Sequence, residues 1–141
     1  MMYKLSSSLF FLLIVMFWSF ASAEELVDAT PESVTGATTV DAKQAKKLFD
    51  QEALFIDLRK ENMWNSGRIP GALWLEMKSA FTQQALEAEA EKSEALVFYC
   101  SGVRCPRSAK ACAKALKWGY TNVNYFRGGF PAWKNEGFPI E

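Results

Sequence analysis

Short apolar runs alternate along this chain with stretches of helical periodicity, which predicts strands alternating with helices. Runs rich in strand-forming residues lie at residues 37–40, 53–58, 73–75, 95–99 and 123–126. A run that is apolar on both faces is typical of a buried parallel strand. The run at 95–99 is the strongest example, so we expect it at the centre of a sheet.

Between these runs, apolar residues recur at helical spacing. Asp41 is a suitable N-cap for a helix that places Ala45 and Leu48 on one face. Gly119 is a suitable left-handed cap for a later helix. The further helices are expected at residues 62–66, 78–92, 108–118 and around 132–133. The order of elements predicts an α/β domain with a mostly parallel central sheet and helices on both faces.

The first 23 residues are expected to be a signal peptide. Lys4 gives a short positive start, residues 9–20 are apolar except for Ser19, and residues 21–23 form a small-x-small cleavage site. The alternative, an uncleaved anchor, is disfavoured because a membrane span needs about 20 apolar residues. We therefore expect cleavage after Ala23 and a periplasmic or secreted protein. Residues 24–36, which are polar and lack periodicity, are interpreted as a flexible lead-in to a single domain at 37–141.

Charge and composition narrow the possible functions. The chain has 16 basic and 16 acidic residues, and removing Lys4 leaves a net charge of −1. This balance gives no indication of a nucleic acid or, after signal cleavage, a membrane as partner. There is no histidine, which excludes Ser-His and Cys-His catalysis and every metal site that needs histidine. No metal and no cofactor is predicted.

The most informative segment is residues 99–108, which follows the expected central strand and leads into a helix. Cys100 stands at this junction, where a helix start presents unpaired N–H groups and the positive end of a dipole. A tight loop with Gly102 can gather several backbone amides into an anion cradle. These amides, with Arg104 and Arg107, favour the thiolate form of Cys100. A thiolate is already nucleophilic, so no histidine base is required.

The sequence resembles the rhodanese-like domain family over essentially all of the expected mature chain. The shared motifs are spread along the chain, and their order and spacing carry the resemblance. They are Phe55-Ile56-Asp57-Leu58-Arg59, Gly67-Arg68-Ile69-Pro70-Gly71-Ala72, Arg107-Ser108-Ala109, residues 119–123, and Gly128-Gly129-Phe130 with Trp133.

The resemblance implies that Cys100 is the cysteine that forms a persulfide. In this family that residue takes a sulfane sulfur from a donor such as thiosulfate and passes it to a thiophilic acceptor. The implied substrate-binding residues are those of the loop, namely Ser101, Gly102, Val103, Arg104, Cys105 and Arg107. The chain departs from the family pattern by two extra residues between Cys100 and Arg107. They either enlarge the loop or extend the helix start, where Pro106 would suit the first turn.

Several other residues that could be functional can also be explained by a structural role. Cys105 is either a spectator or the partner of Cys100 in a disulfide, which an oxidising compartment would permit. Cys112 is expected to be core filler. Asp57 and Arg59 are expected to brace neighbouring loops, and the tryptophans to be buried or half-buried packing residues.

The leading hypothesis is a sulfurtransferase of the thiosulfate type. Its partners would be a small anionic sulfur donor and a thiol or cyanide acceptor. The alternatives are a thiol redox or sulfur-carrier module using Cys100 and Cys105, for which a thiol-redox protein is a candidate partner, and a phosphatase or arsenate reductase suggested only by loop length. A binding domain without chemistry is disfavoured because Cys100 is present.

Overall fold

A parallel sheet of five strands forms the centre of the molecule. The computed structural model describes residues 30–141, so the signal peptide expected at 1–23 lies outside the described residues. The strands are β1 (Thr38–Thr39), β2 (Leu54–Asp57), β3 (Leu73–Trp74), β4 (Leu96–Tyr99) and β5 (Val123–Phe126). They pair in the order β1-β5-β4-β2-β3, and every pair is parallel. The predicted α/β class is confirmed, with β4 in the middle.

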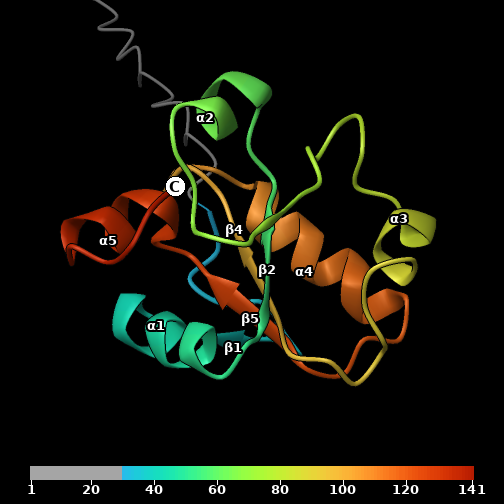
Figure 1. Cartoon of the computed structure of the whole chain (residues 1–141). Coiled ribbons are helices and arrows are strands. Elements are labelled where there is room, and N and C mark those ends of the chain that lie inside the picture. Colours follow the sequence, from blue (N-terminus) through green and yellow to red (C-terminus); the bar gives the residue numbers. More distant parts are fainter. Residues whose placement is uncertain (1–29) are drawn as a thin grey trace, which may run out of the picture.

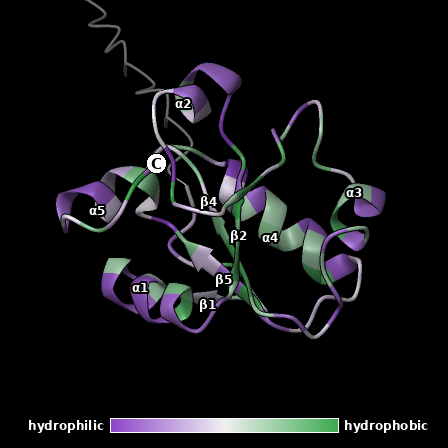
Figure 2. Ribbon diagram, in the orientation of Figure 1, coloured by the Kyte–Doolittle hydropathy of each residue, from purple (hydrophilic) through white to green (hydrophobic). Residues whose placement is uncertain are grey.

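Two apolar cores lie on opposite faces of this sheet. Successive side chains of a strand point to opposite faces, and in β4 Val97 and Tyr99 enter one core while Phe98 enters the other. Helices α1 and α5 cover the first face, and α3 and α4 cover the second (Figure 1). Hydrophobic residues dominate the central strands, whereas the helices carry polar residues outward (Figure 2). The apolar runs therefore mark strands that are buried on both sides.

The helices follow the sequence pattern closely, with one exception. They are α1 (Ala42–Asp50), α2 (Glu61–Asn65), α3 (Gln83–Glu87), α4 (Arg107–Lys117) and α5 (Gly129–Asn135). Asp41 caps α1 as predicted, because its carboxylate accepts from the Gln44 backbone N–H at 2.8 Å. Gly119 follows α4 with φ +91°, the left-handed conformation expected after a helix.

The exception is the helix predicted over residues 78–92, which is wrong in length. Only α3 is helical in this segment, because local side chains satisfy the backbone in other ways. The Glu76 carboxylate accepts from the N–H groups of Lys78 and Ser79 at 3.0 and 2.8 Å, which holds a turn. The Thr82 side chain then caps α3 by accepting from the Ala85 N–H at 3.1 Å.

The segment before β1 also differs from the expectation of a flexible lead-in, as far as it is described. Thr30 is buried and its hydroxyl donates to the Val103 carbonyl in the cysteine loop. The Tyr125 hydroxyl donates to the Pro31 carbonyl at 3.0 Å, and Arg127 donates to the same carbonyl at 3.2 Å. Thr30 and Pro31 thus lie against the cysteine loop and the end of β5. Within residues 30–141, no helix is long and apolar enough to cross a membrane.

Candidate active site

Cys100 directly follows the central strand, at the edge of the sheet where all the parallel strands end. Its side chain is buried, with 1% of the residue exposed, and the loop after it leads to the start of α4. In open α/β sheets, ligands bind at the carboxyl ends of strands, next to helix N-termini. The structure therefore places Cys100 where the sequence predicted it.

The loop after Cys100 is closed by a disulfide between Cys100 and Cys105, whose Cα atoms lie 6.3 Å apart. A turn within the loop brings the two residues together, because the Cys105 N–H donates to the Gly102 carbonyl at 3.0 Å. Helix α4 begins only at Arg107, with Pro106 at the capping position. The residues between Cys100 and Arg107 consequently enlarge the loop, and they do not extend the helix.

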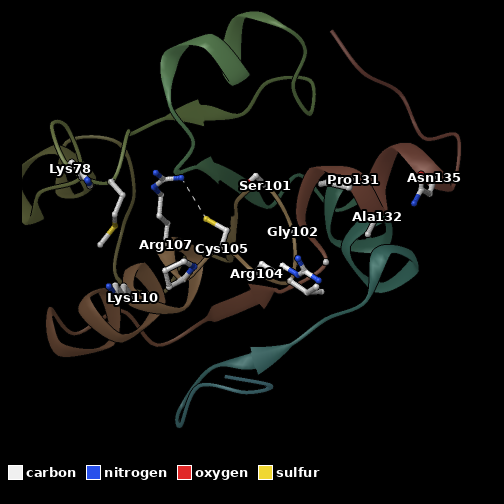
Figure 3. A pocket seen from close by; sticks show the side chains of 14 residues that line it. Lys78, Ser101, Gly102, Arg104, Cys105, Arg107, Lys110, Pro131, Ala132 and Asn135 are labelled. Atoms are coloured by element: carbon white, nitrogen blue, oxygen red, sulfur yellow. Dashed lines mark hydrogen bonds between the residues drawn. The ribbon is translucent and has the colours of Figure 1, made fainter. Parts of the chain in front are cut away.

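An open pocket of about 930 Å³ lies over this loop (Figure 3). It contains Ser101, Gly102, Val103, Arg104, Cys105 and Arg107, so the predicted binding residues are brought together, with Cys100 bonded beneath them. Four cationic side chains line the pocket, and none of its described lining residues is acidic. The cations are Lys78, Arg104, Arg107 and Lys110. Such a surface attracts anions.

The two arginines of the loop have different positions. Arg107 is half-buried, and its Nη1 lies 3.9 Å from the Cys100 Sγ and 3.7 Å from the Cys105 Sγ. Arg104 is exposed, and its guanidinium points away from the Cys105 sulfur (Figure 3). Arg107 is thus the cation that faces the sulfur atoms directly.

Backbone N–H groups add to this positive character. Among residues 30–141, no acceptor is found for the N–H groups of residues 101–104. The start of α4 also has no side-chain cap. Unpaired amides at a loop and a helix start form a ready site for an anion.

The sequence reasoning missed several residues that shape the site. Gly129, at the start of α5, has φ +60°, and a Cβ there would overlap the Cys100 carbonyl. The neighbouring Phe130 N–H donates to the same carbonyl at 3.0 Å. Lys78 and Lys110 were also missed. Lys110 lies one turn beyond Arg107 on α4, and this spacing could have indicated that both face the same side.

Asp57 and Arg59 lie at the end of the neighbouring strand β2 and form a buried ion pair, with Arg59 Nη2 2.6 Å from Asp57 Oδ2. Arg59 also donates to the Gly67 carbonyl at 2.8 Å and lies 4.3 Å from the centre of the Phe130 ring. Neither residue lines the described pocket. These contacts agree with the expected bracing role.

Other residues of the sequence motifs and of the core do not line the described pocket. Arg68 pairs with the Glu141 carboxylate at 3.0 Å and covers the Trp64 ring. Cys112 is fully buried against the sheet, and burial raises the pKa of its thiol well above the ordinary value. Burial likewise raises the pKa of the Tyr99 hydroxyl, so that hydroxyl remains protonated. Trp133 is buried and Trp64, Trp74 and Trp118 are half-buried, as expected.

The fold and the site together define an α/β domain in which a cysteine follows the central strand and heads a loop beneath a pocket lined by cations. The chain belongs to the rhodanese-like domain family, whose model matches residues 41–136. In sequence it is similar to the tRNA uridine(34) hydroxylase of Prochlorococcus marinus (strain MIT 9303), with 33% identity over 106 residues. That match covers 69% of this chain and 33% of the relative, so the chain spans about a third of the relative's length.

Solved structures show the same fold. The Alr3790 protein of Anabaena is 25% identical, with a TM-score of 0.63 and coverage of 72% of this chain and 90% of that one. Thiosulfate sulfurtransferase from Pseudomonas aeruginosa has a TM-score of 0.64 and 21% identity, covering 76% of this chain and 20% of that one. The second likeness concerns the fold alone.

Proposed function

We propose that this protein is a sulfurtransferase that moves a sulfane sulfur from an anionic donor such as thiosulfate, through a persulfide on Cys100, to a thiol or cyanide acceptor. The observation that carries the proposal is the position of Cys100 at the end of the central strand. It lies beneath a pocket lined by four cations and no described acid. Membership in the rhodanese-like family supports it.

The first half of the reaction uses groups of the loop. With the disulfide reduced, the Cys100 thiolate attacks the sulfane sulfur of thiosulfate, and the sulfur–sulfur bond of the donor breaks. Sulfite leaves with the electron pair, and Cys100 carries the new persulfide. Arg107 and the unpaired amides of the loop hold the anions and stabilise the charge on the leaving group.

The second half of the reaction returns the cysteine to its starting state. A thiophilic acceptor attacks the outer sulfur, and the Cys100 thiolate leaves. A pre-formed thiolate needs no general base, which is compatible with a chain that has no histidine. The tRNA hydroxylation named for the curated relatives is outside this proposal, because this chain spans only a third of their length.

The test is thiocyanate formation from thiosulfate and cyanide by the fully reduced protein. We expect turnover by the wild type, no turnover by the Cys100→Ser variant, and retained turnover by a Cys112→Ala control, because Cys112 is buried in the core. Absence of turnover in wild-type protein with Cys100 shown to be a free thiol would overturn the proposal.

The disulfide favours a second candidate function, a thiol redox module. In that case the Cys100–Cys105 bond would exchange rapidly with a small dithiol, while thiosulfate would be neither consumed nor bound. Thiol counting distinguishes the starting states, since the oxidised protein holds one free thiol, Cys112, and the reduced protein holds three. A phosphatase reaction is disfavoured, because it needs a proton donor and no described lining residue of the pocket is an acid.

We also propose that the protein is exported and acts in an oxidising compartment such as the periplasm. The signal-like first 23 residues support this, and a disulfide in so small a domain is typical of such compartments. Expression of the full chain with mass analysis of the product should give a mature N-terminus at Glu24. An intact Met1 on protein recovered from the cytoplasm would contradict it.

A further inference from the structure

The proposed reaction assigns no chemical step to the sulfur atom of Cys105, which lies beside Cys100. Cys105 is buried, with 7% of the residue exposed, yet it lines the pocket and is bonded to Cys100. Arg107 lies within 4 Å of both sulfur atoms. A thiol held at bonding distance from a persulfide can react with it in competition with an acceptor from solution, and it reacts alone where no acceptor is present.

We propose that Cys105 is a second catalytic residue, which discharges the Cys100 persulfide as hydrosulfide. This inference rests on the proposed function, since it needs the persulfide to form. The Cys105 thiolate attacks the inner sulfur, the Sγ of Cys100. The bond between that atom and the outer sulfur breaks, and the outer sulfur leaves with the electron pair and takes up a proton from water.

The electrons balance within the loop. The sulfane sulfur gains two electrons and becomes hydrosulfide, while the two cysteine thiolates lose two electrons and become the disulfide. With the first step included, thiosulfate and two thiols give sulfite, hydrosulfide and one disulfide. No oxidant is required, because the sulfane sulfur itself accepts the electrons.

The bond found in the structure is the product that attack on the inner sulfur would leave. It joins the Sγ atoms of Cys100 and Cys105 directly. Attack on the outer sulfur would instead transfer it to Cys105 as a second persulfide. The rate of thiol–disulfide exchange depends on the stability of the leaving anion. The Arg107 guanidinium beside the Cys100 sulfur lies where it stabilises the departing hydrosulfide.

A cycle that ends by this route leaves the loop oxidised, so this route needs a reductant of the dithiol class. A dithiol attacks one sulfur of the Cys100–Cys105 bond and closes its own disulfide, which releases both thiolates. Cys105 lines the open pocket beside the exposed Val103, which gives the dithiol a route to the bond. The overall activity is dithiol-dependent reduction of thiosulfate to sulfite and hydrosulfide.

The experiment is a single turnover without oxygen. Fully reduced mature protein receives one equivalent of thiosulfate, and hydrosulfide release is measured beside intact mass. We expect the wild type to release one hydrosulfide per chain and to lose two hydrogens. The Cys105→Ser and Cys105→Ala variants should gain one sulfur atom and release none. A Cys112→Ala control should behave as the wild type, because Cys112 faces the core.

The possible outcomes distinguish a failure of the proposed role of Cys105 from a failure of the proposed sulfurtransferase function. Wild-type protein that keeps the added sulfur with Cys105 free would overturn the role of Cys105 and leave sulfur transfer standing. Wild-type protein that neither releases hydrosulfide nor gains sulfur, together with Cys105 variants that gain no sulfur, would overturn the proposed function as well. The wild-type measurement tests the role of Cys105 even if a variant does not fold.

Discussion

Two neighbouring strands, β2 and β4, end at the same edge of the sheet. The polar groups that follow β2 are hydrogen-bonded to one another, whereas those that follow β4 are not. At the end of β2, the Asp57 carboxylate and the Arg59 guanidinium satisfy each other, and Arg59 also binds the Gly67 carbonyl. At the end of β4, the loop after Cys100 leaves the N–H groups of residues 101–104 without acceptors among the described residues.

This difference distinguishes a structural ion pair, at the end of β2, from a candidate binding site, in the loop after β4. Polar groups that are buried and mutually satisfied hold neighbouring segments in place and have little left for a ligand. Unpaired amides beside cations are set to bind an anion. Charged residues at a strand end are therefore informative about function only when their hydrogen bonds are counted.

Substitution Asp57→Asn should cause the greatest loss of stability. It leaves the Arg59 charge buried beside a neutral partner, and breaking a buried ion pair typically costs about 3–5 kcal/mol. Urea unfolding measures this loss. The matched control is Asp50→Asn, which breaks the exposed pair with Lys46 and should cost about 0.5 kcal/mol or less. Similar costs for the two variants would show that the β2 edge is not a brace.

Substitution Gly129→Ala should disturb the cysteine loop itself. The new Cβ would overlap the Cys100 carbonyl in a left-handed conformation, so we expect a loss of about 1–3 kcal/mol in unfolding free energy together with most of the thiocyanate-forming activity. Gly137→Ala is the control, because Gly137 has φ +71° but open space around it. It should lose about 1 kcal/mol and keep its activity. Full activity in Gly129→Ala would rule out dependence of the site on this contact.

Substitution Arg107→Gln should weaken donor binding with little change in stability. Removing the cation nearest the two sulfurs should raise the KM for thiosulfate about tenfold, which corresponds to about 1.4 kcal/mol of binding free energy. Arg104→Gln removes a charge that points away from the sulfurs, and we expect a change of about threefold or less. Steady-state kinetics of the reduced variants make the comparison. Equal effects would mean that the pocket acts only through its summed charge.

The smallest effect is expected at Cys112, whose thiol should not react with an alkylating reagent while the protein is folded. Burial disfavours the charged thiolate and raises the pKa of this thiol, so at pH 8 it stays protonated and inaccessible. Iodoacetamide should leave Cys112 unlabelled in the reduced native protein and label all three cysteines in urea, as located by peptide mass analysis. A label on Cys112 of the folded protein would show that the α4 core opens readily.

Local patterns were sufficient for much of the fold. The strand runs, the Asp41 cap and the Gly119 cap depend on residues close in sequence, and all three predictions are confirmed. The helix predicted at 78–92 was wrong because periodicity does not reveal that Glu76 and Thr82 bind nearby backbone N–H groups. Competing hydrogen bonds of this kind depend on geometry.

The sequence pattern was enough to predict that Cys100 stands at the end of a central strand and that a loop with two arginines follows it. The folded structure was needed to show that Cys105 pairs with Cys100, that Arg107 faces the sulfurs and that a side chain at Gly129 would overlap the Cys100 carbonyl. Lys78 and Lys110 likewise join the pocket from separate elements. The physical reason is that strand order and loop shape bring distant segments to one edge of the sheet, and spacing along the chain does not encode those contacts.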